Sequence, residues 1–493
     1  MNNNYFKSAV LNHSQGNWNK AKEIYEHILK SDPNNYTVLQ NYASLLSQLR
    51  EFKLAKITFE KCLKINPKDS LLVYNYGKFF HDQNNFDRAI NCYEKSFELN
   101  SKNDMSLYNI GNIFLLKNNF QKAITYFKKV LEINSSHYLA YNNIGIAHKR
   151  LGNFGESVKF YRKAIEKKTN YVDAHLNLGT MLLTIGNLKE GFEEYEWRKK
   201  SKSFSDYINY RSLDLKTKVW EGQNLDNKTI LIIAEQGIGD LIQFSRYLYL
   251  IKDKYKTNII FKIKNKQLSH FFSQKNFKIV SDEQKIPEHD YHIFLLSLPR
   301  VFFKTDEIFY KPVNFFQEDK KAQIKWEEKI ASLKKLKIGI HWKTSSLIPE
   351  RDLPFVYFEK LSQKIDADFV VLQKDIKPDE NSKILKNKKI KYFPDIDSSQ
   401  KPFVDSIEII KKLDLVITSD TAISHLSATL GKNTWIILPF VADWRWARDK
   451  ENSSWYPNVL LFRQKKIGEW QSVFDLLEKK LQNFKSFFKV LNL

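Results

Sequence analysis

The sequence predicts an array of α-helical hairpins followed by two small α/β domains. Alanine recurs every 34 residues at Ala21, Ala55, Ala89 and Ala123, and an aromatic residue follows each alanine after four positions. After about residue 203 this period stops, and short apolar runs rich in β-branched residues alternate with amphipathic stretches. The first pattern is typical of stacked helix pairs, and the second is typical of βαβ units.

Six helix pairs are expected in residues 1–203, because the period continues beyond the four alanines. Ser157 and Gly191 take the place of the alanine in the last two units. Glycine stands at one fixed position in the preceding helices: Gly77, Gly111, Gly145 and Gly179. A small residue at a fixed point lets two helices approach closely, and the aromatic ring fills the space beside it. The pattern resembles the tetratricopeptide repeat, whose units stack into a superhelix.

Asparagine keeps the same register in the first helix of each pair. We expect Asn75, Asn109 and Asn143 to line a groove. Because an amide both donates and accepts hydrogen bonds, such a row suits an extended peptide backbone. The alternative is that these asparagines are surface or helix-packing residues of a chain rich in Asn.

The rest of the chain is expected to hold two α/β domains after a linker at 204–226. We expect its apolar runs to be buried strands: 229–234, 258–263, 291–298, 338–342, 369–372, 413–418, 435–438 and 459–462. Helical stretches between most of these runs favour parallel βαβ units. The charged helical segment Lys320–Lys337 is the natural boundary, which gives domains at 227–320 and 321–472.

Composition narrows the classes of function. With 79 Lys and Arg against 56 Asp and Glu, the net charge is +23, which can indicate a nucleic-acid or anionic-lipid partner. The lysines are scattered over helix faces among many Asn and Ile, so we expect no nucleic-acid partner. Cys62 and Cys92 are too few for a disulfide framework or a four-ligand zinc site. Since no run approaches the roughly 20 apolar residues that span a bilayer, we expect a cytoplasmic protein.

The first candidate site is the glycine turn after the run 229–234. The turn contains Gln236, Gly237, Gly239 and Asp240. It leads directly into the apolar helix 241–251, and the amides at such a helix start favour an anion. Asp240 lies at the carboxyl edge of the sheet, where it can act as a general base, or it only caps its helix. Ile242 replaces the third glycine of a dinucleotide fingerprint, so a nicotinamide enzyme is not expected.

The second candidate site follows the run 413–418, where small polar residues open another helix. It contains Asp420, Thr421, Ala422 and His425. The amides of Thr421 and Ala422 can hold a diphosphate, and His425 lies one turn further along the same face. The alternative is that the polar residues are only helix caps and that His425 is a hydrogen-bonded core residue.

Other polar residues near these segments complete the candidate set. They are His341, Lys343, Arg351 and Gln373. Cations beside a helix terminus can neutralise the charge on a leaving diphosphate, and solvated loop cations are the alternative. The acidic segments 366–368 and 395–397 are discounted, so no metal site is expected. The aromatic residues of the segment 444–456 either stack on a base or sugar or lock that loop against its domain.

The chain also resembles bacterial repeat-containing proteins with a glycosyltransferase-like domain. The resemblance lies in five segments, taken in order: AEQGIGDLIQFSRY, HWK, DTAISHLSATLG, WIILPFVADWRWARD and WYPNVLLFRQ. The catalytic part of these bacterial proteins is similar to the lipopolysaccharide heptosyltransferase family. This resemblance implies two Rossmann-like domains that face one another across a cleft, which is the glycosyltransferase type B fold. It also implies a metal-independent, inverting reaction, a donor-binding domain at 321–472, and a final helix at 473–493 that packs back towards the first domain.

The resemblance assigns roles to individual residues. Asp240 corresponds to the catalytic base and Arg351 to the basic residue that contacts the donor phosphates. The diphosphate-binding segment corresponds to Asp420, Thr421 and Ala422, with His425 as the histidine of the same helix. Ala422 stands where heptosyltransferases commonly have glycine, and the residues His341–Lys343 replace the usual small-residue turn. The donor therefore cannot be transferred from the family.

We accordingly expect a glycosyltransferase that uses a nucleotide-diphosphate sugar as donor substrate and needs no other cofactor. The repeats would recruit a protein or polymer acceptor, with Asn75, Asn109 and Asn143 in the acceptor groove. The main alternative is a peptide-binding scaffold whose glycosyltransferase-like domain has lost activity. A basic nucleic-acid binder is the third hypothesis.

Overall fold

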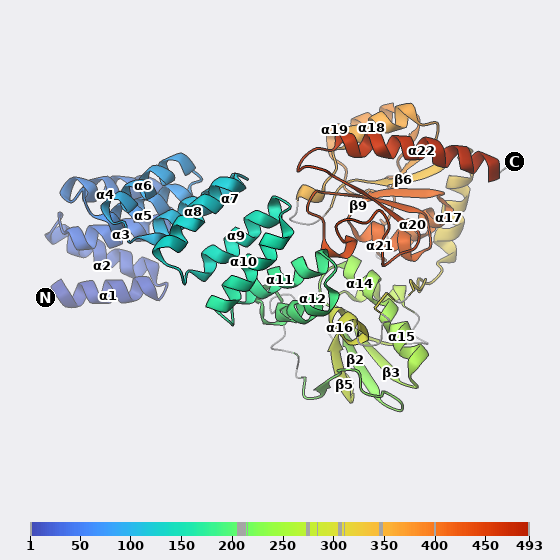
Figure 1. The fold of residues 1–493 in the computed structure, drawn as a ribbon, viewed down its shortest axis with the longest axis horizontal. Helices are drawn as coiled ribbons and strands as arrows, with labels where there is room; N and C mark the ends of the chain where they lie inside the picture. Colours follow the sequence, from blue (N-terminus) through green and yellow to red (C-terminus); the bar gives the residue numbers. More distant parts are fainter. Residues whose placement is uncertain are drawn as a thin grey trace. The chain divides into compact units, whose positions relative to one another are not determined.

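A computed structural model describes most of the chain, which divides into two compact units at Ala174 and His175 (Figure 1). The described residues are 2–204, 213, 215–272, 277–282, 284–303, 308–309, 311–344, 349–398 and 401–491. Part of the segment expected as a linker, residues 205–212 and 214, and the last two residues of the expected final helix lie outside this set.

The N-terminal part is a helical superhelix formed by helices α1 to α12. Their bounds are Asn2–Ser14, Trp18–Ser31, Tyr36–Gln48, Phe52–Ile65, Ser70–Asp82, Phe86–Leu99, Asp104–Leu116, Phe120–Ile133, Tyr138–Arg150, Phe154–Lys167, Val172–Thr184 and Leu188–Tyr195. A short 3-10 helix, η1 (Glu196–Lys200), ends the array. From His175 onward, the sixth pair belongs to the second compact unit.

Close helix contact explains the 34-residue period. A Cβ atom added at Gly111 would lie 2.5 Å from the ring of Phe127, and one at Gly145 would lie 2.6 Å from the ring of Tyr161. Ala89 and Ala123, one repeat apart, are fully buried in the same core. The small residue and the aromatic residue are therefore both required by the geometry of each pair.

The first sheet is parallel, with strand order β1-β5-β2-β3-β4. Its strands are β1 (Lys218–Val219), β2 (Thr229–Ile233), β3 (Asn258–Lys262), β4 (Lys278–Val280) and β5 (Tyr291–Phe294). The run expected as one strand at 291–298 continues after β5 as a 3-10 turn, η4 (Leu295–Ser297), and then helix α16 (Leu298–Phe303). Strand β1 and the buried Trp220 lie in the segment expected as a linker, so this part of the segment belongs to the sheet.

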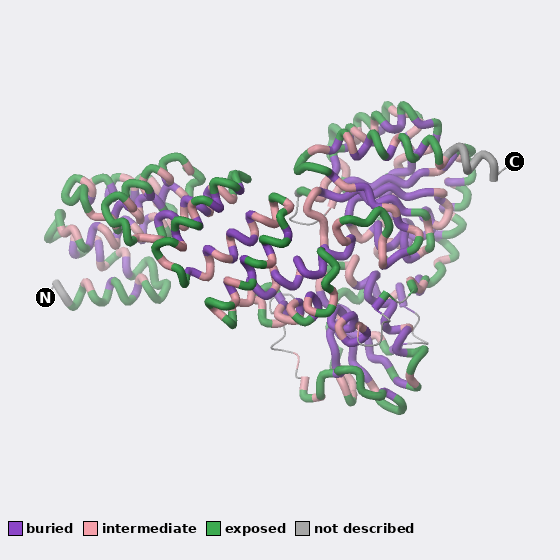
Figure 2. Tube along the Cα trace, in the orientation of Figure 1, coloured by how far each residue is buried: buried purple, intermediate pink, exposed green. Residues whose placement is uncertain are grey.

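The second sheet is also parallel, with order β11-β10-β9-β6-β7-β8. Its strands are β6 (Lys337–His341), β7 (Asp368–Val371), β8 (Ile390–Lys391), β9 (Leu415–Ser419), β10 (Thr434–Leu438) and β11 (Val459–Arg463). The helices around it are α17 (Lys320–Ala331), α18 (Phe355–Lys364), α19 (Pro378–Lys386), α20 (Val404–Lys412) and α21 (Ala422–Thr429). In Figure 2 the central strands of both sheets are buried, as expected for parallel sheets covered by helices, whereas the edge strand β1 is exposed.

The final helix, α22 (Gln471–Leu491), packs on the second sheet through its described side chains. Phe474 stacks on Tyr357 of α18, and Leu477 and Leu481 are fully buried in the core beneath β9 and β10. Figure 1 shows α22 lying beside α18. The resemblance implied packing towards the first domain, whereas the described part of the helix covers its own domain.

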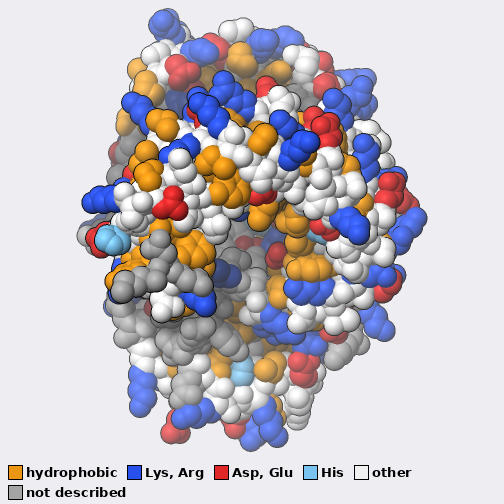
Figure 3. Space-filling model, turned by 90° about the vertical axis from the view of Figure 1, so that its left-hand side faces the viewer, with side chains coloured by type: hydrophobic (Ala, Val, Ile, Leu, Met, Phe, Trp, Pro, Cys, Tyr) orange, Lys and Arg blue, Asp and Glu red, His pale blue; other side chains and the backbone are white. Residues whose placement is uncertain are grey.

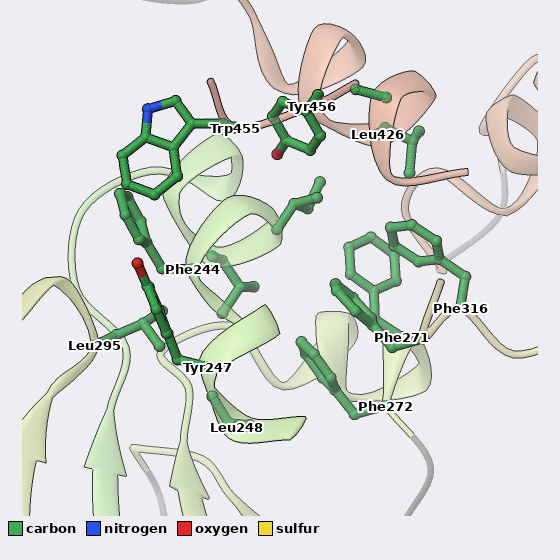
Figure 4. Packing of buried hydrophobic residues seen from close by; sticks show 14 of the residues in the cluster. Phe244, Tyr247, Leu248, Phe271, Phe272, Leu295, Phe316, Leu426, Trp455 and Tyr456 are labelled. Carbon is green, nitrogen blue, oxygen red and sulfur yellow. The ribbon is translucent and has the colours of Figure 1, made fainter. Parts of the chain in front are cut away.

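An aromatic core joins the loops of the two sheets. The expected helix 241–251 is divided at Ser245 into α14 (Ile238–Phe244) and α15 (Arg246–Lys254). Phe244 of α14 packs at 5.6 Å from Trp455, a residue that precedes β11 (Figure 4). Arg246 donates to the carbonyl of Trp455, with its guanidinium 4.6 Å from the ring of Tyr456. This core positions the turn after β2 against α21.

Candidate functional site

The twelve residues expected around Asp240 and the donor all line one cavity of about 970 Å³. They are Gln236, Gly237, Gly239, Asp240, His341, Lys343, Arg351, Gln373, Asp420, Thr421, Ala422 and His425. Most lie just beyond the carboxyl ends of β2, β6, β7 and β9, the edge where parallel sheets bind ligands. The volume is in the range of small-molecule sites.

Asp240 occupies the third position of α14, and Gly237 is the N-cap. Its Oδ2 accepts a hydrogen bond of 3.0 Å from the amide of Gly237, while Oδ1 forms an ion pair with Arg445. The Asp240 carboxylate therefore binds an amide at the start of α14, where we expected an anion of the ligand to bind. Burial raises the pKa of Asp240, and Arg445 opposes this shift by favouring the charged form.

Carboxylates and guanidinium groups alternate along one wall of the cavity. Beyond Asp240 and Arg445, Asp443 accepts from Arg445 Nη1 at 2.7 Å and from Arg351 Nη2 at 3.2 Å. Arg351 Nη1 lies 3.4 Å from Oδ2 of Asp420. Burial raises the pKa of Asp420, whereas Asp443, although buried, is held at a pKa of about 2 by Arg445 and Arg351. Two guanidinium groups therefore border the cavity, each already paired with carboxylates.

The start of α21 differs from the expected arrangement of caps. Thr421 is the N-cap, and within the described residues its side chain makes no capping hydrogen bond. Asp420 pairs with Arg351. The first amides of a helix have no intrahelical acceptor, and here Ala422 and Ile423 border the cavity. Thr421 is therefore an N-cap by position alone, and a ligand-binding role for Asp420 and Thr421 stays a prediction.

Both histidines of the site are buried and neutral at physiological pH. Burial lowers the pKa of His341 and of His425 to about 3. His341 Nδ1 lies 3.5 Å from the hydroxyl of Thr421, and His425 Nδ1 lies 3.1 Å from that of Tyr456. Neutral imidazoles can orient a ligand by hydrogen bonding but add no positive charge for a phosphate.

The remaining expected residues are positioned by a hydrogen bond, by backbone conformation or by a close helix contact. The side-chain oxygen of Gln373 accepts from the amide of Lys343 at 3.0 Å. Gln236 adopts a left-handed conformation with φ of 64°. Gly239 is in close contact with α21, because a Cβ there would lie 2.9 Å from Cδ2 of His425. The two helix starts therefore touch beside the cavity.

Sequence analysis did not assign Asp443 and Arg445 to the site. A signal was present, since both follow β10 at the same sheet edge as Thr421 follows β9. Trp444 and Trp446 are buried at 6% and 1% exposure, and Trp446 stacks on His425 at 5.2 Å. These two rings lock the loop, as the second alternative stated.

The asparagines of the repeats make contacts within the array. Asn109 Nδ2 donates to the hydroxyl of Tyr74 at 2.9 Å, and Asn143 Nδ2 donates to that of Tyr108 at 3.1 Å. Each bond joins neighbouring first helices, which favours a packing role for these two amides. Asn75 is half-buried in α5. Whether the three asparagines bind an acceptor stays a prediction.

Positive side chains are dispersed over the face of the molecule that Figure 3 shows. On the face shown in Figure 3, Lys and Arg lie among acidic, apolar and uncharged side chains. This view agrees with a compositional origin of the net charge of +23.

Comparison with known proteins identifies the helical array. Segments 4–35, 36–69, 72–103, 105–137 and 138–168 each match the tetratricopeptide repeat family. Residues 4–168 are tetratricopeptide repeats. The repeats are followed by an α/β region with two parallel sheets. Among the described residues, no helix combines the length and apolar character needed to cross a bilayer.

One curated relative is Protein FlbA of Caulobacter vibrioides, 24% identical over 322 residues. The match covers 60% of this chain and 52% of FlbA, so the chain spans about half the length of this relative. Similar solved structures include PilW, a type IV pilus biogenesis factor, with a TM-score of 0.37, 19% identity and coverage of 42% of this chain and 95% of PilW. MamA gives a TM-score of 0.30, 24% identity and coverage of 33% and 94%.

Proposed function

We propose that this protein is a glycosyltransferase that moves a sugar from a nucleotide-diphosphate donor to an acceptor hydroxyl. The observation that carries the proposal is the shared cavity, which brings a buried carboxylate, two guanidinium groups and the start of α21 together. These groups come from loops of both sheets and match the charges of one substrate: a diphosphate and an acceptor proton.

The diphosphate would bind at Arg351, Arg445 and the first amides of α21. Guanidinium groups bind phosphate oxygens through two parallel hydrogen bonds, and helix amides add dipolar stabilisation. A diphosphate competes with Asp443 and Asp240 for these arginines. Its arrival would thus exchange carboxylate partners for phosphate partners and free the Asp240 carboxylate.

Asp240 would then accept the proton of the acceptor hydroxyl. The acceptor oxygen forms a bond to the anomeric carbon, the bond between that carbon and the diphosphate oxygen breaks, and the electron pair leaves with the nucleoside diphosphate. Burial raises the pKa of Asp240 and makes its carboxylate a stronger base than an exposed one. The arginines neutralise the charge that develops on the leaving group.

The repeats would recruit the acceptor. Stacked helix pairs present an extended surface formed by their first helices, which suits a protein or a polymer better than a small molecule. A screen of donors and acceptors must identify the sugar, the nucleotide and the acceptor.

One observation favours a second candidate, a scaffold without activity. Asp240 is held by both Arg445 and the amide of Gly237, so both oxygens of its carboxylate already have a partner and must be released before it can accept a proton. In that case the cavity would bind a nucleotide diphosphate without turnover, or would only hold the domains together.

The purified full chain should be tested for transfer and donor hydrolysis with a panel of nucleotide sugars, and for nucleotide diphosphate binding by calorimetry. We expect turnover with one donor and competitive inhibition by its nucleoside diphosphate. Binding without turnover would support the scaffold. Absence of both would overturn the proposal.

A further inference from the structure

We infer that Tyr195, on the last repeat helix, is a positioning residue that holds the turn Gln236–Gly237 at the cavity. The inference rests on the proposed function for its ligand, while its structural part is testable without one. The sixth helix pair departs from the others in the position of its aromatic residue.

In earlier pairs the aromatic residue serves the pair itself. A Cβ at Gly77 would lie 2.8 Å from the ring of Tyr93, and the same relation holds between Gly111 and Phe127. In the sixth pair, the three atoms nearest to a Cβ at Gly179 are the backbone nitrogen of Tyr195 and the carbonyl carbon and Cβ of Glu194. The backbone of α12 takes the place of the ring, and the ring of Tyr195 is released from its usual position.

The released ring lies at the cavity loops. Its centroid is 5.8 Å from that of Trp444, which adjoins Arg445, and the guanidinium carbon of Arg198 lies 4.9 Å from it. The hydroxyl of Tyr195 accepts from Nε2 of Gln236 at 2.9 Å and lies 3.3 Å from Oε1, to which it donates. Tyr195 thus contacts the turn after β2 and the loop after β10.

The hydroxyl is dispensable for repeat packing. Phenylalanine takes the equivalent position at Phe59 and Phe127, and both rings are fully or almost fully buried. The hydroxyl of Tyr195 therefore serves something other than helix pairing, and its bonded partner in the turn is Gln236.

Gln236 needs such support because its backbone is left-handed, with φ of 64°. Residues other than glycine rarely adopt this backbone conformation, because the Cβ atom crowds the neighbouring carbonyl oxygen. The conformation directs the chain from β2 into α14, where Gly237 donates to Asp240. A second anchor from the same segment, Arg198 of η1, pairs with the buried Glu235 at 2.7 Å. The last repeat and η1 thus fix two consecutive residues of the turn.

The test uses full-length Tyr195→Phe, which removes only the hydroxyl, with Tyr161→Phe as the matched control one repeat earlier. Amide hydrogen exchange of residues 235–240 should accelerate in Y195F and stay unchanged in Y161F. Affinity for UDP or ADP, whichever the wild-type protein binds, should fall roughly three- to tenfold in Y195F, the range expected for one hydrogen bond.

Gln236→Gly separates positioning from general stability, because glycine adopts the left-handed conformation without support. In the Q236G background, Y195F should produce no further change in exchange or affinity. If Y195F matches Y161F in exchange, or if its effect persists undiminished beside Q236G, the inference is wrong. If the wild-type protein binds neither UDP nor ADP nor any other nucleoside diphosphate, the proposed function fails, while the exchange measurement still decides the role of Tyr195.

Discussion

Arg445 forms an ion pair with Asp240, which lies 205 positions earlier in the chain. The arginine follows β10 of the second sheet, and the aspartate belongs to α14, which follows β2 of the first. Their side chains are 8% and 17% exposed, so the pair is largely shielded from water. One contact therefore links the two sheets and restrains the carboxylate that is proposed to act as the base.

Asp240→Asn removes the proton acceptor and leaves the shape of the side chain unchanged. Transfer should fall about 10²- to 10⁴-fold, the range for loss of a general base. Affinity for the nucleoside diphosphate should rise, because Arg445 no longer has this carboxylate as a partner. Initial rates and calorimetry on the same preparation measure both effects. Undiminished turnover would remove Asp240 from the chemistry.

Arg351→Gln should weaken diphosphate binding. Loss of a charge-assisted contact predicts roughly a 10- to 100-fold lower affinity. Arg448→Gln is the matched control, since Arg448 is 38% exposed and pairs with Asp449, which is 89% exposed. Equal affinities of the two variants would place the phosphates elsewhere in the cavity.

Gly239→Ala should disturb the contact between α14 and α21. The new Cβ would lie 2.9 Å from His425, whose ring is packed between Trp446 and Tyr456. Overpacking of this kind costs about 1–3 kcal/mol of unfolding free energy. Gly155→Ala, at an exposed helical position with no atom within 4 Å of the added Cβ, should cause no loss. Denaturant titration distinguishes the two variants, and equal unfolding free energies would show that the His425 ring can shift away from the added Cβ at no cost.

The buried histidines predict weaker stability in acid. The pKa of His341 and His425 falls from 6.5 to about 3 on folding, so between these values the unfolded chain binds protons that the native protein does not. The unfolding free energy should therefore fall as pH decreases from about 6.5 to 3, by about 1.4 kcal/mol per pH unit for each histidine.

Tryptophan fluorescence can follow this loss, because Trp18 is the one tryptophan outside the second unit. His341→Gln should reduce the slope by about 1.4 kcal/mol per pH unit, whereas His27→Gln, at an exposed position in α2, should leave it unchanged. A slope independent of His341 would mean that another group controls acid unfolding.

Asn143→Ala should destabilise the repeats. The amide bonds Tyr108 and also Oδ1 of Asn112 at 2.8 Å, and its loss predicts about 1 kcal/mol. Asn41→Ala is the comparison, because Asn41 donates to the carbonyl of Thr37 in its own helix. An unchanged melting temperature, with weaker binding of an acceptor, would instead favour the groove.

The sequence was most informative where residue type and spacing act together. The 34-residue step follows from contacts such as Gly111 with Phe127, and long β-branched runs became strands. Strands β1 and β8, with two residues each, are too short to leave a pattern. The bond between Asp240 and Arg445 was unpredictable, because it depends on how loops from two sheets meet. The unusual position of the Tyr195 ring was likewise unpredictable, because it accompanies the shortness of α12, and the 34-residue period does not indicate helix length.

The buried pair of Arg198 and Glu235 determines where the chain can be divided. A fragment that begins at residue 204 lacks Arg198, the cation that pairs with the buried Glu235 in the full chain. A fragment that begins at His175 retains both. A replacement of the repeats by another array should therefore leave the sixth hairpin in place, because its last helix and η1 hold the turn after β2.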